Sequence, residues 1–197
     1  AFSAVCSLEA AHFVATGTLE SFAEQQLVDC AGIRYGNFGC NGGLQQYAYK
    51  YYESHDAILE ADYPYTAKDG SCQYDSLSHS AIEVSSYLDV TPNSPSQMKA
   101  AVNVQPVAVS IEADKAVFQL YKTGVFNSSK CGTQLDHAVA VVGYGTDAGQ
   151  DYWILRNSWS TGWGEDGYMR IHKVQGKGIC NLNQNVSYIS SITVNGA

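Results

Sequence analysis

Two apolar segments of strand length flank a short loop in the C-terminal half of the chain, over residues 138–144 and 152–157. Both are rich in β-branched and aromatic residues and end in glycine or a polar turn, which predicts two neighbouring buried strands. His137 stands at the start of the first segment and Asn157 at the end of the second. In an antiparallel pair these positions can face each other, so that an amide oxygen holds one imidazole nitrogen and leaves the other free. The pattern therefore predicts an oriented catalytic base.

Each of these pieces is a weak signal when taken alone, because a histidine beside an aspartate is more often a hydrogen-bonded core or turn residue than a catalyst. Together, the Asp-His-Ala-Val run at 136–139, the Asn-Ser-Trp run at 157–159 and the Gly-Trp-Gly run at 162–164 resemble segments of the papain-like cysteine peptidases. Ser160 departs from that pattern, since the family usually has glycine there. We expect this departure to cost little.

Further segments carry the same resemblance along the whole chain and in the family's order. They are Ala1–Val5, Ser21–Cys30, Gly39–Gly43 and Tyr63–Tyr65. The resemblance implies an α+β, papain-like two-lobe fold with the active-site cleft between the lobes. The helical lobe is expected over residues 1–88 and the antiparallel β-barrel-like lobe over 89–188, with a C-terminal tail over 189–197. Together they would form one peptidase domain.

The catalytic cysteine of this family falls outside the sequence. The resemblance places it two positions before Ala1, followed by a tryptophan, and it places the glutamine that stabilises the oxyanion further upstream. We therefore expect a partial sequence, truncated just after the Cys-Trp pair. Cys6 is an unsuitable substitute, because it lies in the apolar pattern of an opening helix and free cysteine is among the most buried residue types.

The six cysteines indicate disulfide bonds in an oxidising compartment, because none lies in a C-x-x-C or Cys/His cluster that would bind zinc. We expect neither a metal nor a cofactor. The resemblance implies the pairs Cys30–Cys72 and Cys131–Cys180. It leaves Cys40 unpaired, because the usual partner belongs to the upstream segment, while a Cys6–Cys40 bridge stays open as an alternative.

The composition is acidic, with a formal net charge of −8, which argues against nucleic acid and anionic membranes as partners. No segment approaches the length of a transmembrane helix. At 197 residues and 45% hydrophobic content, the chain can bury a substantial core. The expected protein is a monomer that is lysosomal, vacuolar or secreted.

Helical signals dominate the first part of the chain. A helix is expected from Ser3 to Thr16, ended by Gly17, and a second helix runs to Cys30 with a capping box at residues 21 and 24. Apolar and aromatic residues at helical spacing predict a third helix over residues 44–52.

Strand signals follow a short capped helix that has Pro95 at its first position and Gln97 completing its cap. The expected strands cover residues 107–111, 138–144, 152–157, 168–172 and 189–194.

The resemblance also implies a role for each site residue. His137 partners the cysteine thiolate and protonates the leaving amine, Asn157 orients the imidazole through a hydrogen bond, and Trp159 shields that bond from water. The backbone of Gly43 pairs with an extended peptide, although a plain glycine turn is the alternative explanation. Gly42, Asp136 and Trp159 are further substrate-binding positions, and the S2 pocket is lined by Leu44, Ser110, Leu135, Ala138 and Asn185. We therefore expect an apolar residue such as Leu, Val or Phe at P2.

Two Asn-x-Ser sequons bear on this assignment. Asn127 lies in a polar stretch and is the better candidate for glycosylation. Asn185 opens the other sequon and departs from the small apolar residue that is common at the floor of the pocket. A glycan on Asn185 would exclude it from the pocket.

The interval between Cys40 and Cys72 is short and holds no adjacent histidine pair, whereas exopeptidase relatives typically narrow the cleft with an added loop there. The expected activity is therefore that of a cathepsin L-like cysteine endopeptidase, made as a zymogen. Its expected partners are protein and peptide substrates, cystatin-type inhibitors and its own propeptide. A catalytically inactive homologue that binds peptides or inhibitors is one alternative, and a structural or storage protein is the other.

Overall fold

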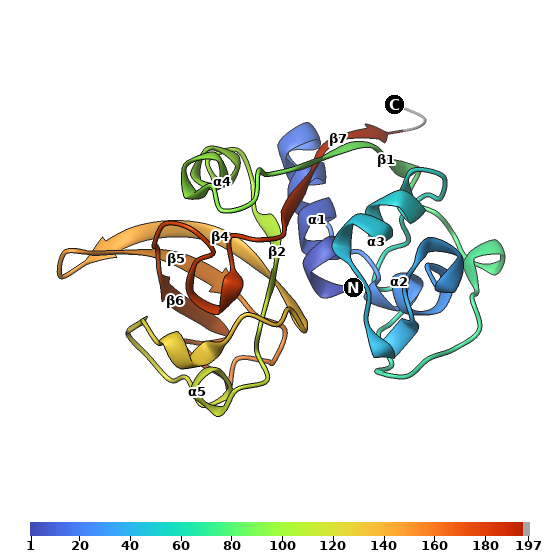
Figure 1. The fold of residues 1–197 in the computed structure, drawn as a ribbon. Coiled ribbons are helices and arrows are strands. Elements are labelled where there is room, and N and C mark those ends of the chain that lie inside the picture. The colour runs from blue at the N-terminus through green and yellow to red at the C-terminus, as the bar shows by residue number, and fades with distance from the viewer. Residues whose placement is uncertain (195–197) are drawn as a thin grey trace. The chain divides into compact units, whose positions relative to one another are not determined.

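The computed structural model describes residues 1–194 of the 197-residue chain, which divides into two compact units (Figure 1). The first unit comprises residues 1–88 and 189–197, and the second comprises residues 89–188. Short 3-10 helices lie in the connecting segments at Ile33–Tyr35, Gly39–Asn41, Tyr74–Ser76, Ser129–Cys131 and Ile179–Asn181.

Three helices form most of the first unit. Helix α1 (Phe2–Thr16) ends as predicted at Gly17, whose φ of 75° is the left-handed conformation that glycine adopts most readily. Helix α3 (Gln45–Tyr52) also matches its prediction and buries Tyr51 and Tyr52. The periodicity of apolar residues was therefore sufficient to locate both helices.

Helix α2 (Glu24–Cys30) ends where the sequence predicts, but its predicted capping box is wrong. The N-cap residue is Ala23, and no side chain caps the helix. The backbone of the preceding segment pairs with another part of the unit instead, because Ala23 N–H donates to Ile58 O (2.9 Å) and Ser21 O accepts from Glu60 N–H (2.9 Å). These tertiary hydrogen bonds hold Ser21 outside the helix.

Strand β1 (Ile82–Asp89) was not predicted from the sequence. Within the first unit it runs beside the later part of β7 (Val186–Val194), and Ser85 Oγ lies 2.6 Å from Thr193 Oγ1. In β1 the buried positions of the alternating pattern are limited to Ile82 and Val84. This pattern is too short to predict a strand from the sequence. Strand β7 begins three residues before its predicted start at Ile189.

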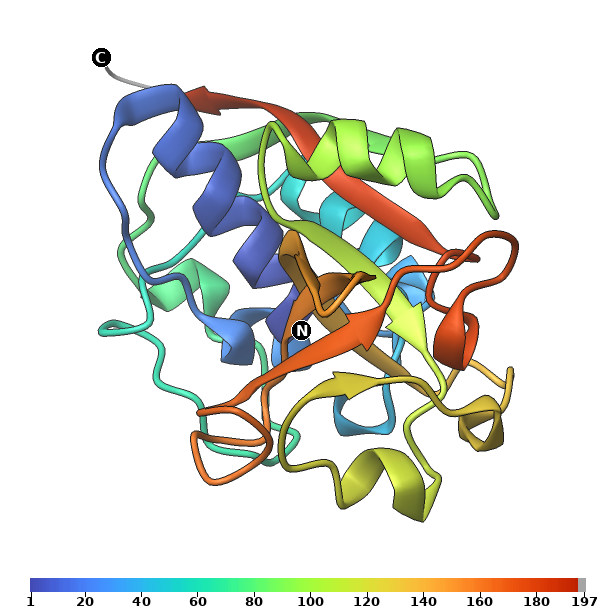
Figure 2. The same ribbon diagram turned by 90° about the vertical axis from the view of Figure 1, so that its left-hand side faces the viewer.

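The second unit is built on an antiparallel sheet with the strand order β7-β2-β4-β5-β6-β3, in which only the β3–β6 pair is parallel. Strands β4 and β5 form a long hairpin (Figure 1), and α5 and β3 lie at the same end of this unit (Figure 2). The bounds are β2 Val107–Ile111, β3 Val125–Phe126, β4 His137–Asp147, β5 Gln150–Arg156, β6 Tyr168–His172 and α5 Ala116–Gln119. The predicted strands in this unit are confirmed, with β4 longer at both ends; β3 and α5 were missed.

Helix α4 (Pro95–Val102) packs on β4 and has the predicted proline at its first position. Ser94 Oγ accepts from Gln97 N–H (3.4 Å), as predicted for the N-cap. The Gln97 side chain accepts from Thr91 N–H (3.3 Å), so it pairs with the turn before the helix.

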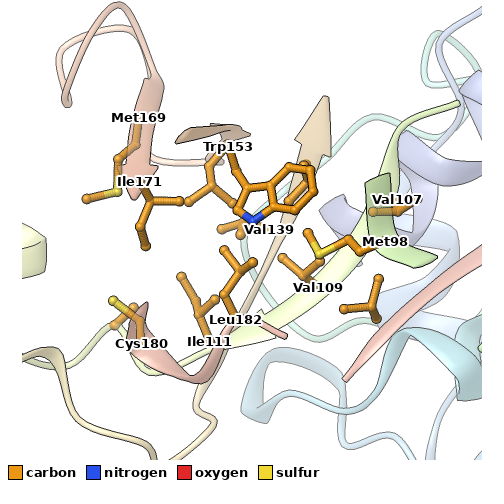
Figure 3. Close-up of a cluster of buried hydrophobic side chains, with 14 of the residues drawn as sticks. Met98, Val107, Val109, Ile111, Val139, Trp153, Met169, Ile171, Cys180 and Leu182 are labelled. Atoms are coloured by element: carbon orange, nitrogen blue, oxygen red, sulfur yellow. The ribbon is translucent and has the colours of Figure 1, made fainter. Parts of the chain in front are cut away.

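The core of the second unit lies around Trp153 and strand β2 (Figure 3). Every residue of β2 is buried, including the polar Ser110, so this strand does not alternate between apolar and polar residues. Trp153 is almost fully buried beside Val139 and Met98 (Figure 3). Burial of each such large side chain contributes about 1.5–3 kcal/mol, so this core fixes the strands that carry the site.

Two disulfide bonds are present, Cys30–Cys72 in the first unit and Cys131–Cys180 in the second. These are the pairs that the sequence resemblance implies. Cys40 is exposed and outside both bonds, Cys6 is buried within α1, and the alternative Cys6–Cys40 disulfide does not form.

Candidate active site

His137 and Asn157 meet at one end of the β4–β5 hairpin. His137 is the first residue of β4, and Asn157 directly follows the last residue of β5. His137 Nε2 lies 2.8 Å from Asn157 Oδ1. The antiparallel register, in which Ala140 faces Arg156, brings the two residues to the same end of the hairpin. The two strands predicted from the sequence therefore bring His137 and Asn157 together, as expected.

The hydrogen bonds at Asn157 determine which imidazole nitrogen carries the proton. Asn157 Oδ1 also accepts from Ser158 N–H (2.8 Å), which identifies this amide atom as the oxygen. Because a carbonyl oxygen can only accept, His137 Nε2 must be the donor in the bond between them. In the neutral ring Nδ1 is then unprotonated and can accept a proton from another group.

Both backbones of the pair are held by the sheet. His137 faces Ile111 of β2, and Asn157 N–H donates to Gly167 O (3.0 Å). The side chain of Asn157 is buried, and its Nδ2 has no hydrogen-bond partner among the described residues. The amide is therefore fixed through its oxygen and its backbone.

Trp159 lies on the imidazole of His137. The ring centroids are 5.0 Å apart with an interplanar angle of 25°, which is a stacked arrangement. Trp159 in turn makes edge contacts with Phe118 and Trp163, and Trp163 Nε1 donates to Gln119 O (3.0 Å). This aromatic cluster holds the indole in place over the histidine. Phe118 and Gln119 were missed from the sequence because α5 is too short to show periodicity.

Burial lowers the pKa of His137, and the hydrogen bond to Asn157 and the neighbouring carboxylate of Asp136 act in the opposite direction. The ring therefore favours its neutral form until a nearby anion compensates for the buried charge. A neutral imidazole with a free Nδ1 is a proton acceptor, which is the property of a general base.

Ser160 has a φ of 64°, in the left-handed region that favours glycine. A non-glycine residue there carries about 1–2 kcal/mol of strain. A weak bond from Gly162 N–H to Ser160 Oγ (3.4 Å) offsets only part of it. The conformation gives a physical reason for glycine at this position, and the expectation that serine costs little here stays a prediction.

Three of the residues assigned to the S2 pocket lie together in the second unit. Ser110 on β2 faces Ala138 on β4, and Asn185 Nδ2 donates to Ser110 Oγ (2.9 Å). The backbone repeats this contact, because Ser110 N–H donates to Asn185 O (3.0 Å). The side-chain amide of Asn185 is therefore held against the end of β2.

Leu135 and Asp136 lie on the segment that enters β4. Leu135 is 40% exposed. Asp136 N–H donates to Ile111 O (3.0 Å), and its carboxylate accepts from Ala113 N–H (2.7 Å). The Asp136 side chain thus anchors this segment to the end of β2, in addition to the substrate contact that the resemblance implies.

Gly42, Gly43 and Leu44 belong to the first unit, before α3. Gly42 has a φ of 99°, and a Cβ atom on Gly43 would collide with the side chain of Asn37. Asn37 Oδ1 accepts from Leu44 N–H (3.1 Å), and Asn37 Nδ2 donates to Ala31 O (2.9 Å). Both glycines therefore have a local structural reason, in addition to the peptide contact that the resemblance implies.

The described residues contain no cluster of three or more His, Cys, Asp or Glu side chains suited to a metal ion. None of the helices within residues 1–194 is long and apolar enough to cross a membrane.

An antiparallel sheet that carries an amide-oriented, tryptophan-covered imidazole defines a site for histidine acid–base chemistry. The comparison with protein families assigns it further: the model of the papain family cysteine proteases matches residues 1–190. The chain belongs to this family, and its fold is the α+β papain-like fold.

Relatives and solved structures agree with this assignment. The chain is 45% identical to the probable cysteine protease RD21B of Arabidopsis thaliana over 191 residues, which cover 95% of this chain and 41% of the relative. It is 45% identical to the oryzain beta chain of Oryza sativa over 174 residues, covering 88% of this chain and 37% of that relative. The chain thus spans less than half the length of these curated relatives. The structure of the bromelain protease from Ananas comosus, in complex with the E64 inhibitor, is 39% identical with a TM-score of 0.89, covering 96% of this chain and 87% of that one.

Proposed function

We propose that the full-length protein is a cysteine endopeptidase in which His137 works with a cysteine located upstream of Ala1. The observation that carries this proposal is the bond from His137 Nε2 to Asn157 Oδ1, because it leaves Nδ1 as the proton-accepting nitrogen. Membership of the papain family supports cysteine as the nucleophile.

The reaction then divides into two half-reactions, acylation and deacylation, and in each of them Nδ1 first takes a proton and then gives it up. His137 Nδ1 takes the proton of the thiol, and the resulting thiolate attacks the carbonyl carbon of the peptide. The imidazolium gives that proton to the departing amine, which leaves an acyl-enzyme. Nδ1 next takes a proton from water as the water attacks the acyl carbon, and the thiol is restored when the acid departs. Asn157 keeps the ring oriented through both steps, and Trp159 keeps water away from the Nε2 bond.

We infer an apolar preference at P2, with Leu, Val or Phe favoured. Leu135 and Ala138 supply apolar surface, and the hydrogen bond from Asn185 Nδ2 to Ser110 Oγ directs these two polar groups towards each other. This pairing favours an apolar substrate side chain over a polar one. Gly42, Gly43 and Leu44 are proposed to bind the substrate from the first unit, with the Gly43 backbone pairing with an extended peptide.

The setting of the protein is part of the same proposal. Two disulfides fit a lysosomal or vacuolar compartment or secretion. We propose synthesis as a zymogen, inhibition by cystatin-type proteins and a monomeric active form; the solved ragweed protease Amb a 11, 34% identical, is described as a proform. Asn127 is exposed and is the proposed glycan site. A glycan on Asn185, whose Nδ2 donates to Ser110 Oγ, would exclude it from the pocket.

The proposal is tested on the full-length protein expressed from its extended coding sequence. The upstream codons should specify Cys-Trp directly before Ala1, and the purified protein should cleave a peptide with Leu at P2. Replacing His137 by Ala should lower kcat about 100- to 10,000-fold, since that is the usual contribution of a positioned acid–base group. A different residue in place of the upstream cysteine, combined with peptide binding and no turnover, would establish the inactive binding homologue instead.

A further inference from the structure

A buried carboxylate lies close to the site and has no part in the chemistry described above. Glu112 directly follows strand β2, and its side chain is only 2% exposed. Burial of a carboxylate is unfavourable unless charges and hydrogen bonds compensate for the lost water. The contacts of Glu112 therefore indicate what it holds.

The carboxylate of Glu112 fills the inside of the turn formed by residues 132–134. Gln134 N–H donates to Oε2, and Lys115 Nζ lies 2.9 Å from Oε1. Gly132 has a φ of 90°, and a Cβ atom on it would overlap the carboxylate. The Gln134 N–H and the Lys115 ammonium lower the pKa of Glu112, so it stays charged across the neutral range.

The backbone of Glu112 is tied to a second segment of the same unit. Glu112 N–H donates to Cys180 O (3.0 Å), next to the Cys131–Cys180 disulfide. Asn181 Nδ2 donates to Thr133 O (3.0 Å), which joins this segment to the turn that the carboxylate fills. One residue thus contacts both segments that lead to the proposed S2 pocket and to the histidine.

Both segments are short, so a change in their backbone conformation also moves the site residues that follow them. Leu135, Asp136 and His137 follow Gln134 without a break. Asp136 is anchored to the residues on either side of Glu112, because its N–H donates to Ile111 O and its carboxylate accepts from Ala113 N–H. Asn185 follows Asn181 by one short turn before β7. A displaced turn at 132–134 would therefore shift Leu135 before any other residue of the site.

We propose that Glu112 is a positioning residue of the active site, whose carboxylate holds the 132–134 turn and thereby sets the placement of Leu135 and the entry into His137. The inference rests on the proposed peptidase function. The carboxylate holds the turn by accepting the hydrogen bond from Gln134 N–H. The ammonium group of Lys115 pairs with the other carboxylate oxygen.

The test compares three variants of the full-length protein. Glu112→Ala removes the acceptor, Glu112→Gln keeps an oxygen that can accept from Gln134 N–H, and Lys115→Met removes the other partner of the same carboxylate without touching the turn. Glu112→Ala should lower kcat/KM about 10- to 100-fold, the range expected when a site group is displaced by about 1 Å. Glu112→Gln should recover activity to within about threefold, and Lys115→Met should stay within about twofold, as expected when the turn keeps its geometry.

Two further readouts separate positioning from simple loss of stability. In Glu112→Ala, the ratio of kcat/KM for peptides with Leu and with Ala at P2 should change, because Leu135 moves. The pH profile for alkylation of the upstream thiol by iodoacetamide should also change, because the imidazole moves.

Equal losses in Glu112→Ala and Glu112→Gln would overturn the proposal, since the charge would then matter and the acceptor would not. It would also be overturned if activity fell only in proportion to the unfolded fraction, with the P2 ratio and the pH profile unchanged. Failure of the underlying function looks different, because the unmodified full-length protein would then lack turnover, or His137→Ala would retain it.

Discussion

Glu24 should make the first unit less stable as the pH rises towards neutrality. It is the first residue of α2, and burial, together with the nearby carboxylates of Glu60 and Glu9, raises its pKa from 4.5 to about 7. A carboxyl whose folded pKa is raised binds a proton more readily in the folded state than in the unfolded state. Its favourable contribution is therefore complete below pH 4.5 and is lost as the pH rises to about 7.

The magnitude follows from the size of the shift. A change from 4.5 to about 7 corresponds to about 3 kcal/mol without correction. Glu24 is partly exposed, and solvent screening reduces the expected effect to about 1–2 kcal/mol. The free energy of unfolding should therefore fall by about that amount between pH 4.5 and 7.5 through this one group.

Urea unfolding across this pH range measures the effect in the full-length protein, with His137→Ala as the background so that self-digestion cannot interfere. The neutral variant Glu24→Gln should remove most of the decline, because it cannot lose a proton. Glu53→Gln, a change at an exposed carboxylate of the same unit, is the matched control and should leave the slope as it is. An unchanged slope in Glu24→Gln would refute the reasoning.

Three further predictions concern single sites. Ser160→Gly should stabilise the second unit by about 0.5 kcal/mol, because relief of the left-handed strain exceeds the greater freedom of glycine in the unfolded chain; a lower urea midpoint would contradict this. Asn157→Ala should lower kcat about 10- to 100-fold with a smaller change in KM, as measured by steady-state kinetics, because the imidazole loses its orienting acceptor but not its backbone position. Replacing both Cys30 and Cys72 by Ala should lower the free energy of unfolding by about 2–4 kcal/mol in a chemical denaturation experiment, since their bridge closes a loop with a sequence separation of 42.

The parts of the fold that repeat a pattern could be predicted from the sequence. The helix ended by Gly17 shows periodicity, and strand β2 is apolar at every position except Ser110. Strand β1 shows only two alternating buried residues and was missed, because its stability comes from its pairing with β7. The capping box at Ser21 failed for a related reason, since tertiary hydrogen bonds took the backbone out of the helix.

The candidate site also contains parts that could be predicted from the sequence and parts that could not. His137 and Asn157 could be placed opposite each other because both lie at the ends of regular strands. The support of Glu112 for Gln134 could not, because it depends on an irregular turn whose path no repeating pattern encodes. Likewise, the residues around Ser160 show no pattern that reveals its positive φ.

The identity of residue 157 explains how a buried histidine can serve both as acceptor and as donor of a proton. An aspartate there would accept the same bonds from Nε2–H and Ser158 N–H, but its charge would raise the pKa of His137 and hold the ring in its protonated form. The neutral amide fixes the tautomer without that effect, and burial then lowers the pKa of the imidazole. The carboxylate of Asp136 favours the imidazolium but does not outweigh burial, so further charge must come from the reaction partner at Nδ1. In the proposed mechanism that partner is a thiol, and loss of its proton to Nδ1 forms the ion pair, which ties protonation of His137 to formation of the nucleophile.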